Sequence, residues 1–319
     1  MVAYYLVFFV ACCVVLYFAG NLAVNGLSRI AKFLEWKEFT AAFFVMAMAA
    51  SLPNLLLAVM AVTNGVPELS LGDVMGGNVV DMTLAIALAA FFSKKGIDAQ
   101  GKTVQTSLAF TFLAAVLPLI LLLDNNLSRI DGAILILFFF GYVYWLLSKK
   151  DRFKAIYSGH KINDGNNFGK FLGDIGKVLA GIVLMMAVAQ GIVMSAESFS
   201  VDFDIALPLV GILIIGLGNS FPEIYFGIAS ARAGKTKMIL GDVMGAVILP
   251  GTLVLGMVAL VSPIKIDGVT MFAAARYFLL AAAVFFFICV KTGQKVTKKE
   301  AVLLLSIYIA FLLTEILAK

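Results

Sequence analysis

Four carboxyl groups stand inside apolar stretches of this 319-residue chain: Asp73, Asp81, Glu223 and Asp242. An ionised carboxylate is costly in hydrocarbon, so such a residue usually faces the interior of a helix bundle and marks a path for ions or protons. Asp81 and Glu223 fall near the middle of their stretches, and no Lys or Arg stands at the same depth to pair with them. We therefore expect these two acids to bind a transported cation or to hold a proton.

Neutral residues that carry oxygen atoms stand near these acids. Carboxylates, amide carbonyls and hydroxyls suit hard cations such as Ca²⁺, Mg²⁺ and Na⁺, whereas transition metals prefer His or Cys. The sole histidine, His160, lies outside the apolar stretches. Thr83 and Thr252 are candidates, although threonine in a spanning helix commonly bonds to a carbonyl of its own helix. The remaining expected ion-binding residues are Ser51, Asn54, Asn78, Asn219 and Ser220.

Asp73 and Asp242 occupy the same place in two copies of the hexapeptide LGDVMG, at 71–76 and 240–245. Both are expected in the first turn of a helix, where a negative charge is favoured by the helix dipole. Alternatively, they serve as ion entrances or proton relays at the two mouths of the site. The glycines of each G-x-x-x-G segment permit two helices to pack closely.

Pro53 and Pro222 stand about half-way along two other apolar stretches, in the segments SLPN (51–54) and SFPE (220–223). Each proline removes a backbone donor and disfavours helix at the preceding residue. A simple kink would be tolerated in a spanning helix. Their equivalent depth favours broken helices that line a cavity, where freed carbonyls can coordinate a cation.

The composition places these residues in a membrane. The chain is 62% hydrophobic and 13% charged, with a mean hydropathy of +1.03, whereas soluble domains have about 45–50% apolar and about 25% charged residues. This excludes a soluble enzyme, a nucleic-acid-binding module and a disordered chain. No catalytic or phosphate-binding motif is present, so no enzyme and no cofactor are expected. The expected partners are the lipid bilayer and inorganic cations, and the oligomeric state is left open.

The apolar runs are continuous rather than alternating, which favours spanning helices over a closed barrel. The sequence therefore predicts an all-α polytopic membrane protein with ten transmembrane helices. The first run has no basic segment before it and is interpreted as a spanning helix rather than a cleaved signal peptide. The predicted spans are 2–24, 40–63, 69–92, 103–123, 129–147, 176–196, 205–231, 238–261, 269–290 and 299–317.

The basic residues predict the orientation of these spans. Of the 24 Lys and Arg residues, 20 fall in the loops that follow helices 1, 3, 5, 7 and 9. Because Lys and Arg favour cytoplasmic loops, both termini are expected outside the cytoplasm. The net charge of +5 is then a signal of topology and requires no acidic partner. The one long polar loop, 148–175, is expected to be a cytoplasmic linker between two halves, 1–147 and 176–319.

The two halves carry an internal repeat. The hexapeptide that begins at position 71 recurs at position 240, and the segments SLPN and SFPE are separated by the same offset. The predicted repeats cover about 40–92 and 205–261. Because each half holds five helices, an odd number, the second half must insert upside down relative to the first. Inverted repeats of this kind are typical of secondary transporters, whose substrates bind near the midplane between the repeats.

This arrangement resembles the cation/calcium antiporter superfamily, and most closely prokaryotic sodium/calcium exchangers. The resemblance implies exchange of Ca²⁺ for Na⁺ or H⁺ by alternating access in a prokaryotic plasma membrane, with ligands from helices 2, 3, 7 and 8. Ser51 and Ser220 match the motif hydroxyls, and Glu223 matches the central glutamate of the second repeat. Asp81 occupies an acid-or-amide ligand position.

The chain departs from the family pattern at several motif positions. Asn54 stands where the first repeat normally has glutamate, and Pro250 stands where helix 8 normally supplies Asp or Asn. Gly77 and Ala246 replace hydroxyl residues, and asparagines are replaced by Asp73 and Asp242. The remaining midplane charge of −2, from Asp81 and Glu223, balances one divalent ion but suits three sodium sites poorly.

Four functional hypotheses follow. The leading one is exchange of Ca²⁺ for Na⁺, or for H⁺, since burial favours the protonated form of a carboxyl group. A second hypothesis keeps the fold but transports another cation, such as Mg²⁺ or K⁺, coupled to protons. A passive cation channel and a non-transporting homologue are the remaining alternatives.

Overall fold

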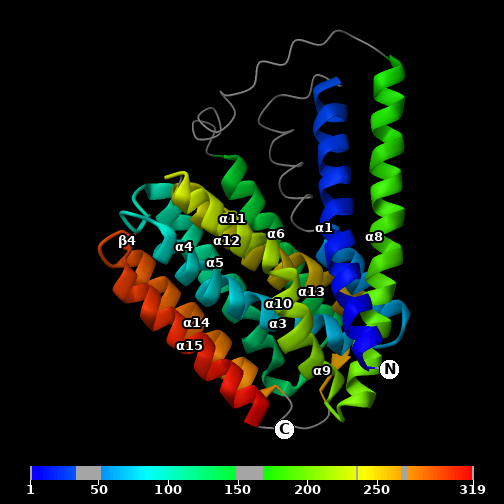
Figure 1. The fold of residues 1–319 in the computed structure, drawn as a ribbon. Coiled ribbons are helices and arrows are strands. Elements are labelled where there is room, and N and C mark those ends of the chain that lie inside the picture. Colours follow the sequence, from blue (N-terminus) through cyan, green and yellow to red (C-terminus); the bar gives the residue numbers. More distant parts are fainter. Residues whose placement is uncertain (1, 34–51, 149–167, 235, 267–271, 318–319) are drawn as a thin grey trace.

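The computed structural model describes residues 2–33, 52–148, 168–234, 236–266 and 272–317, and most of them are helical (Figure 1). Within these ranges, eight helical segments are long and apolar enough to cross a membrane. Two shorter apolar helical segments, Tyr5–Gly20 and Leu52–Thr63, stand where the first two spans are expected. The ten predicted spans are therefore all represented, the second one from Leu52 onward.

Some spans are single helices and others are chains of helical pieces. The single helices are α1 (Val2–Phe33), α5 (Lys102–Leu121, followed by the 3₁₀ turn η2, Leu122–Asp124), α6 (Arg129–Leu147), α8 (Phe168–Asp202), α14 (Ala273–Lys291) and α15 (Lys298–Leu317). The third span is α3 (Pro67–Val80), η1 (Asp81–Ala85) and α4 (Ile86–Phe92). The seventh is α9 (Leu207–Val210), η4 (Gly211–Ile215), α10 (Gly216–Asn219) and α11 (Phe221–Arg232). The eighth is α12 (Thr236–Leu249), η5 (Pro250–Val254) and α13 (Leu255–Val261).

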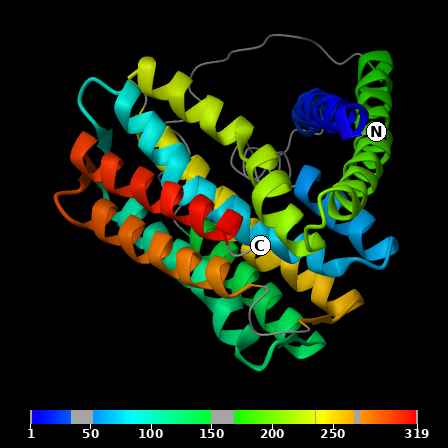
Figure 2. The ribbon, with the colours of Figure 1, turned by 60° about the horizontal axis from the view of Figure 1, so that its bottom comes forward.

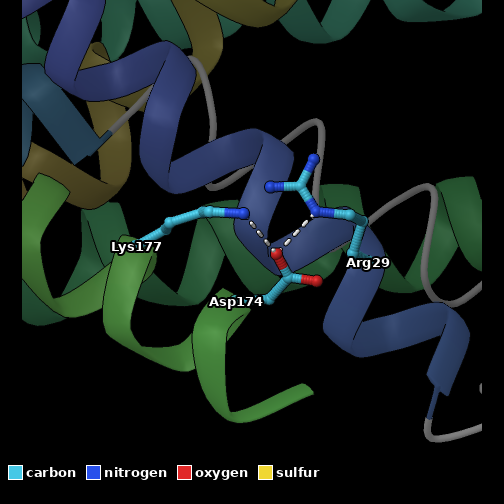
Figure 3. Close-up of polar contacts among 3 residues, drawn as sticks. All are labelled: Arg29, Asp174 and Lys177. Carbon is cyan, nitrogen blue, oxygen red and sulfur yellow. Dashed lines mark hydrogen bonds and ion pairs between the residues drawn. The ribbon is translucent and has the colours of Figure 1, made fainter. Parts of the chain in front are cut away.

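Helices α1 and α8 are longer than predicted and pack side by side, at one edge of the molecule (Figures 1 and 2). Their 32 and 35 residues correspond to about 48 and 52 Å, more than the ~30 Å hydrocarbon core of a bilayer. Residues 168–175, expected to belong to the linker, form the first turns of α8. There Asp174 joins the two helices: its Oδ1 accepts from Arg29 Nε at 2.7 Å and from Lys177 Nζ at 3.3 Å (Figure 3).

Two small strand pairs show that the repeats are inverted. Strand β1 (Ile97–Asp98) pairs with β4 (Lys295–Val296), and β2 (Asn126–Leu127) pairs with β3 (Ile264–Lys265), both antiparallel. Strands β1 and β2 lie at opposite ends of α5, so the two pairs lie at opposite ends of the bundle. The constant offset between the two copies of the repeat makes β4 the counterpart of β2. However, β4 pairs with β1, at the other end of the bundle. Equivalent loops of the two halves therefore lie at opposite ends, as predicted for an inverted repeat.

The third and seventh spans cross at glycines. A Cβ atom added to Gly76 would lie 2.0 Å from the carbonyl oxygen of Ile212, and one on Gly72 would lie 2.4 Å from that of Pro208. From the other side, a Cβ on Gly216 would lie 2.6 Å from the backbone nitrogen of Gly77. The first G-x-x-x-G segment thus packs closely against another helix, as the sequence predicts.

Within the ranges that the structure describes, three π-helical segments interrupt the spans, and the sequence does not predict them. Two of them, η1 and η5, begin at Asp81 and Pro250, which the repeat offset relates to each other. Such segments are rare and frequently mark functional sites, because an extra residue in a turn redirects side chains and carbonyls. These two π-helical turns therefore occupy equivalent positions in the two repeats.

The seventh span is broken at Ser220, which lies between α10 and α11 with ψ of −1°. Pro222 is the second residue of α11, where its missing N–H is not required for helical hydrogen bonding. The predicted break in helix 7 is thus confirmed. Pro53 is likewise the second residue of the described helix Leu52–Thr63, and the predicted residues 40–51 of this span, including Ser51, lie outside the described ranges.

Candidate ion-binding site

A small cavity lies where the helices of the two repeats meet. Its lining comes from the second, third, seventh and eighth spans, which are the four spans that the resemblance implies. The lining residues among those described are Asn54, Asp73, Val74, Gly77, Asn78, Asp81, Asn219, Ser220, Glu223, Ala246 and Pro250.

Asp81 and Glu223 both face this cavity. Asp81 is 4% exposed, and Asp81 Oδ1 and Glu223 Oε2 are buried without a hydrogen-bond partner among the described residues. The Ser220 hydroxyl lies within reach of the Asp81 carboxyl group and donates to the carbonyl of Gly77 at 3.4 Å. A buried acceptor without a donor is costly, so these two oxygens are suited to a cation or a proton.

Asp73 is a further acid of the lining. It is the seventh residue of α3 rather than part of its first turn, and it is 5% exposed. Its Oδ1 accepts a hydrogen bond of 2.9 Å from Asn219 Nδ2, across the glycine crossing. The capping interpretation is therefore wrong for Asp73, because a carboxylate this far along the helix lies beyond the turn where the dipole acts.

Asp242 lies beside the cavity and is outside its lining. It is the seventh residue of α12, so the capping interpretation is wrong here also. Its Oδ2 is buried without a partner among the described residues. The charge of Asp242 acts on both Asp81 and Glu223, and so does the charge of Asp73. The four acids thus form one electrostatic group, and the described lining contains no Lys or Arg.

The neutral candidates divide into two groups. Asn54, Asn78, Asn219 and Ser220 line the cavity, as the sequence predicts. Thr83 and Thr252 are fully buried and donate to carbonyls of their own helices, of Val79 and Ile248 respectively. Neither threonine belongs to the described lining of the cavity, so the structure does not place them as ion ligands.

The sequence left Asp73 open between helix capping and a role as an entrance or proton relay, and the structure places it in the lining of the cavity. A signal for this placement was available, because Asp73, Gly77 and Asp81 are spaced by four residues and share one face of a helix. All four motif departures with neutral residues, at Asn54, Gly77, Ala246 and Pro250, also line the cavity. The chain has therefore changed the chemistry of the cavity itself.

The acids do not converge on a single point. Among the described residues, no three His, Cys, Asp or Glu side chains are placed to hold one metal ion together. An ion in this cavity would need neutral oxygens beside its carboxylate ligands. Asparagine amides and the Ser220 hydroxyl can supply them.

Inverted helical repeats that enclose buried carboxylates define a membrane cation antiporter and not an enzyme. The chain belongs to the sodium/calcium exchanger protein family, whose sequence model matches residues 4–148 and 175–317. The unmatched residues between these two segments coincide closely with the predicted linker.

Similar proteins agree with this assignment. The chain is 25% identical to the sodium/calcium exchanger MaX1 of Methanosarcina acetivorans, covering 91% of this chain and 92% of that protein. It is 26% identical to the inner membrane protein YrbG of Escherichia coli, covering 84% and 83% respectively. A solved structure of the sodium-calcium exchanger NCX_Mj superimposes with a TM-score of 0.64 at 22% identity, over 98% of this chain and 99% of that one. This last comparison shows the shared fold.

Proposed function

We propose that the protein exchanges Ca²⁺ for Na⁺ or H⁺ across the membrane by alternating access, with the ion bound near the midplane between the two repeats. The observation that carries this proposal is the pair of unpartnered carboxylate oxygens, on Asp81 and Glu223, in a cavity whose described lining has no basic residue. A passive channel is disfavoured because the protein supplies its own two-fold pair of repeats around a small cavity.

The proposed Ca²⁺ ligands are the two carboxylates together with neutral oxygens. Two negative charges balance one divalent cation, and oxygen donors match the preference of Ca²⁺. The neutral ligands are proposed to be Ser51, Asn54, Asn78, Asn219 and Ser220, of which Ser51 lies outside the described residues.

The lining also supports proton coupling as a second candidate. Gly77, Ala246 and Pro250 bring no side-chain oxygen to the cavity, so these three positions supply no side-chain ligand for additional sodium ions. A proton needs only one carboxylate, and the charges of Asp73 and Asp242 act on Asp81 and Glu223 here. Such a site is also compatible with another cation, such as Mg²⁺ or K⁺, exchanged for protons.

We propose that the protein resides in the plasma membrane of a prokaryote with both termini outside the cytoplasm. The N-terminal end of α1 and the C-terminal end of α15 lie at the same end of the bundle (Figure 1), which an even number of spans requires. The excess of Lys and Arg in the opposite loops favours their placement in the cytoplasm.

The test is uptake of radioactive Ca²⁺ into proteoliposomes that contain the purified protein. Uptake is measured with an outward Na⁺ gradient, with an outward H⁺ gradient, and with neither. Uptake under only one gradient identifies the counter-ion. Uptake that occurs without any gradient, and that does not saturate with Ca²⁺ concentration, indicates a channel. Absence of Ca²⁺ uptake under every gradient refutes the proposed Ca²⁺ exchange, and unlabelled Mg²⁺ and K⁺ then test the alternative cations.

Substitutions at the two central acids test the site. Glu223→Gln and Asp81→Asn are each expected to weaken Ca²⁺ binding about 10- to 100-fold, the range for loss of a hydrogen bond or contact with a charged group. Glu197→Gln is the matched control, because Glu197 belongs to α8 and does not line the cavity. Wild-type Ca²⁺ affinity in both central variants would show that the ion binds elsewhere.

A further inference from the structure

The third and eighth spans each carry three residues at a spacing of four along one helix face. On the third span these are Asp73, Gly77 and Asp81, and all three line the cavity. Their repeat equivalents on the eighth span are Asp242, Ala246 and Pro250, and only Ala246 and Pro250 line it. Eight residues correspond to about 12 Å along a helix. Because the repeats are inverted, the acids at the start of each row flank the cavity on opposite sides.

The two flanking acids have different surroundings. Asp73 accepts a hydrogen bond from Asn219 at 2.9 Å and is 5% exposed. Asp242 is partly exposed, and its Oδ2 has no partner among the described residues. The sequence provides a reason for this difference, because the repeat equivalent of Asn219 in the first half is Ala50. A methyl group cannot donate a hydrogen bond, so Asp242 lacks an equivalent donor at that position.

Asp242 is the one acidic residue among the described residues of the eighth span. The two lining residues of this span, Ala246 and Pro250, carry no side-chain oxygen, whereas the third span contributes both Asp73 and Asp81. Asp242 acts electrostatically on Asp81 and Glu223. Asp81, which is 4% exposed and whose Oδ1 has no partner among the described residues, lines the cavity and is acted on by the charges of both flanking acids. A cation bound at Asp242 would therefore change the electrostatic potential at Asp81 and Glu223.

We infer that Asp242 is the carboxylate at which the monovalent counter-ion, H⁺ or Na⁺, binds and leaves, whereas Asp73 is held by Asn219 and does not exchange it. This inference rests on the proposed function. The hydrogen bond fixes Asp73 as a structural contact between the third and seventh spans. Asp242 Oδ2 has no such partner among the described residues, which makes the two sides of the cavity inequivalent although the backbone repeats are equivalent.

Measuring Ca²⁺/Ca²⁺ exchange and net Ca²⁺ uptake separately tests this inference independently of the proposed function. Exchange of Ca²⁺ for radioactive Ca²⁺ across the liposome membrane needs no counter-ion, whereas net Ca²⁺ uptake requires one. Asp242→Asn is expected to retain Ca²⁺/Ca²⁺ exchange and to lower counter-ion-driven uptake about 10- to 100-fold, as for the loss of a charged ligand. Asp73→Asn is the matched control: its amide oxygen can still accept from Asn219, so the ratio of the two modes should remain that of the wild type.

A further variant keeps the inference testable if Asp242→Asn does not fold. Asn219→Ala removes the donor to Asp73, and because Asn219 is also a proposed Ca²⁺ ligand the variant is assayed at saturating Ca²⁺. It is expected to make the dependence of net uptake on counter-ion concentration steeper. The inference is overturned if Asp242→Asn and Asp73→Asn change the ratio of the two modes equally, or if neither changes it. It is also overturned if Asn219→Ala leaves the counter-ion dependence unchanged. Absence of both modes in the wild type would instead refute the proposed Ca²⁺ exchange.

Discussion

Of the described glycines, Gly76 is the one at which an added Cβ atom would approach the seventh span most closely. Replacing Gly76 by alanine therefore tests whether this crossing positions the site. The added Cβ would lie 2.0 Å from the carbonyl oxygen of Ile212 and 2.8 Å from its Cα. Ordinary contact begins at 3.4 Å, so the two backbones must move apart by more than an ångström. No change of rotamer can relieve this contact, because the opposing atoms belong to the backbone.

The movement of the third and seventh spans away from each other in Gly76→Ala has two expected consequences. Overpacking lowers the free energy of unfolding by about 1–3 kcal/mol, and we place Gly76→Ala at the upper end because the opposing atoms belong to the backbone. Alanine offsets about 1 kcal/mol of this loss through its higher helix propensity. The net loss of stability is then about 2 kcal/mol. The same movement would stretch the 2.9 Å bond between Asp73 and Asn219 beyond hydrogen-bonding distance. A misplacement of about 1 Å in a reactive site can lower a rate about 100-fold, and we expect a similar loss of Ca²⁺ uptake.

The assay compares thermal unfolding in detergent and Ca²⁺ uptake in proteoliposomes for Gly76→Ala and Gly218→Ala. Gly218 is the matched control on the seventh span, because a Cβ there would lie 3.6 Å from Cys13 Sγ and from Phe9 Cζ, in ordinary contact. Gly218→Ala should unfold at the wild-type temperature and transport normally. If Gly76→Ala proves equally stable and active, the glycine crossing does not position the site, and the reasoning fails.

Other expectations concern residues outside the ion ligands. Thr83→Val and Thr252→Val should leave the apparent KM for Ca²⁺ unchanged, since both hydroxyls donate within their own helices; a large increase in KM would show that they bind the ion during the cycle. Arg29→Ala should lower stability by less than about 1 kcal/mol, because the Arg29 side chain is 47% exposed and exposed ion pairs contribute little. Thermal unfolding at low and high salt measures this, and a loss of several kcal/mol would show that the pair with Asp174 is essential to the packing of α1 on α8.

The positions of the spans and the inverted repeat could be read from the sequence because they follow from local and additive properties. Lipid permits only structures that satisfy their own backbone hydrogen bonds, so each long apolar run predicts one helix. The constant offset between the two copies, together with an odd number of helices in each half, requires the inversion that the strand pairs display. The boundaries were less accurate at α1 and α8, because a helix can continue into water after its apolar run ends.

The acids Asp81 and Glu223 could also be predicted as a pair, since charge in an apolar stretch requires an interior site. The surroundings of the other polar groups could not be predicted. Whether Thr83 faces the cavity or bonds to its own helix depends on the π-helical turn that begins at Asp81, and nothing in the local sequence predicted that turn.

The six residues around Asp73 and around Asp242 are identical, so only the packing of the third span against the seventh shows that Asn219 is the residue that bonds to Asp73. The close approach of backbones at Gly72, Gly76 and Gly216 brings Asn219 within 2.9 Å of Asp73. That distance is a property of two helices far apart in the chain, and no spacing within either helix contains it. The sequence therefore specifies a membrane-embedded pair of inverted repeats with buried acids. The packing between helices decides that Asp73 is hydrogen-bonded to Asn219, whereas Asp242 Oδ2 has no partner within the part of the chain that the structure describes.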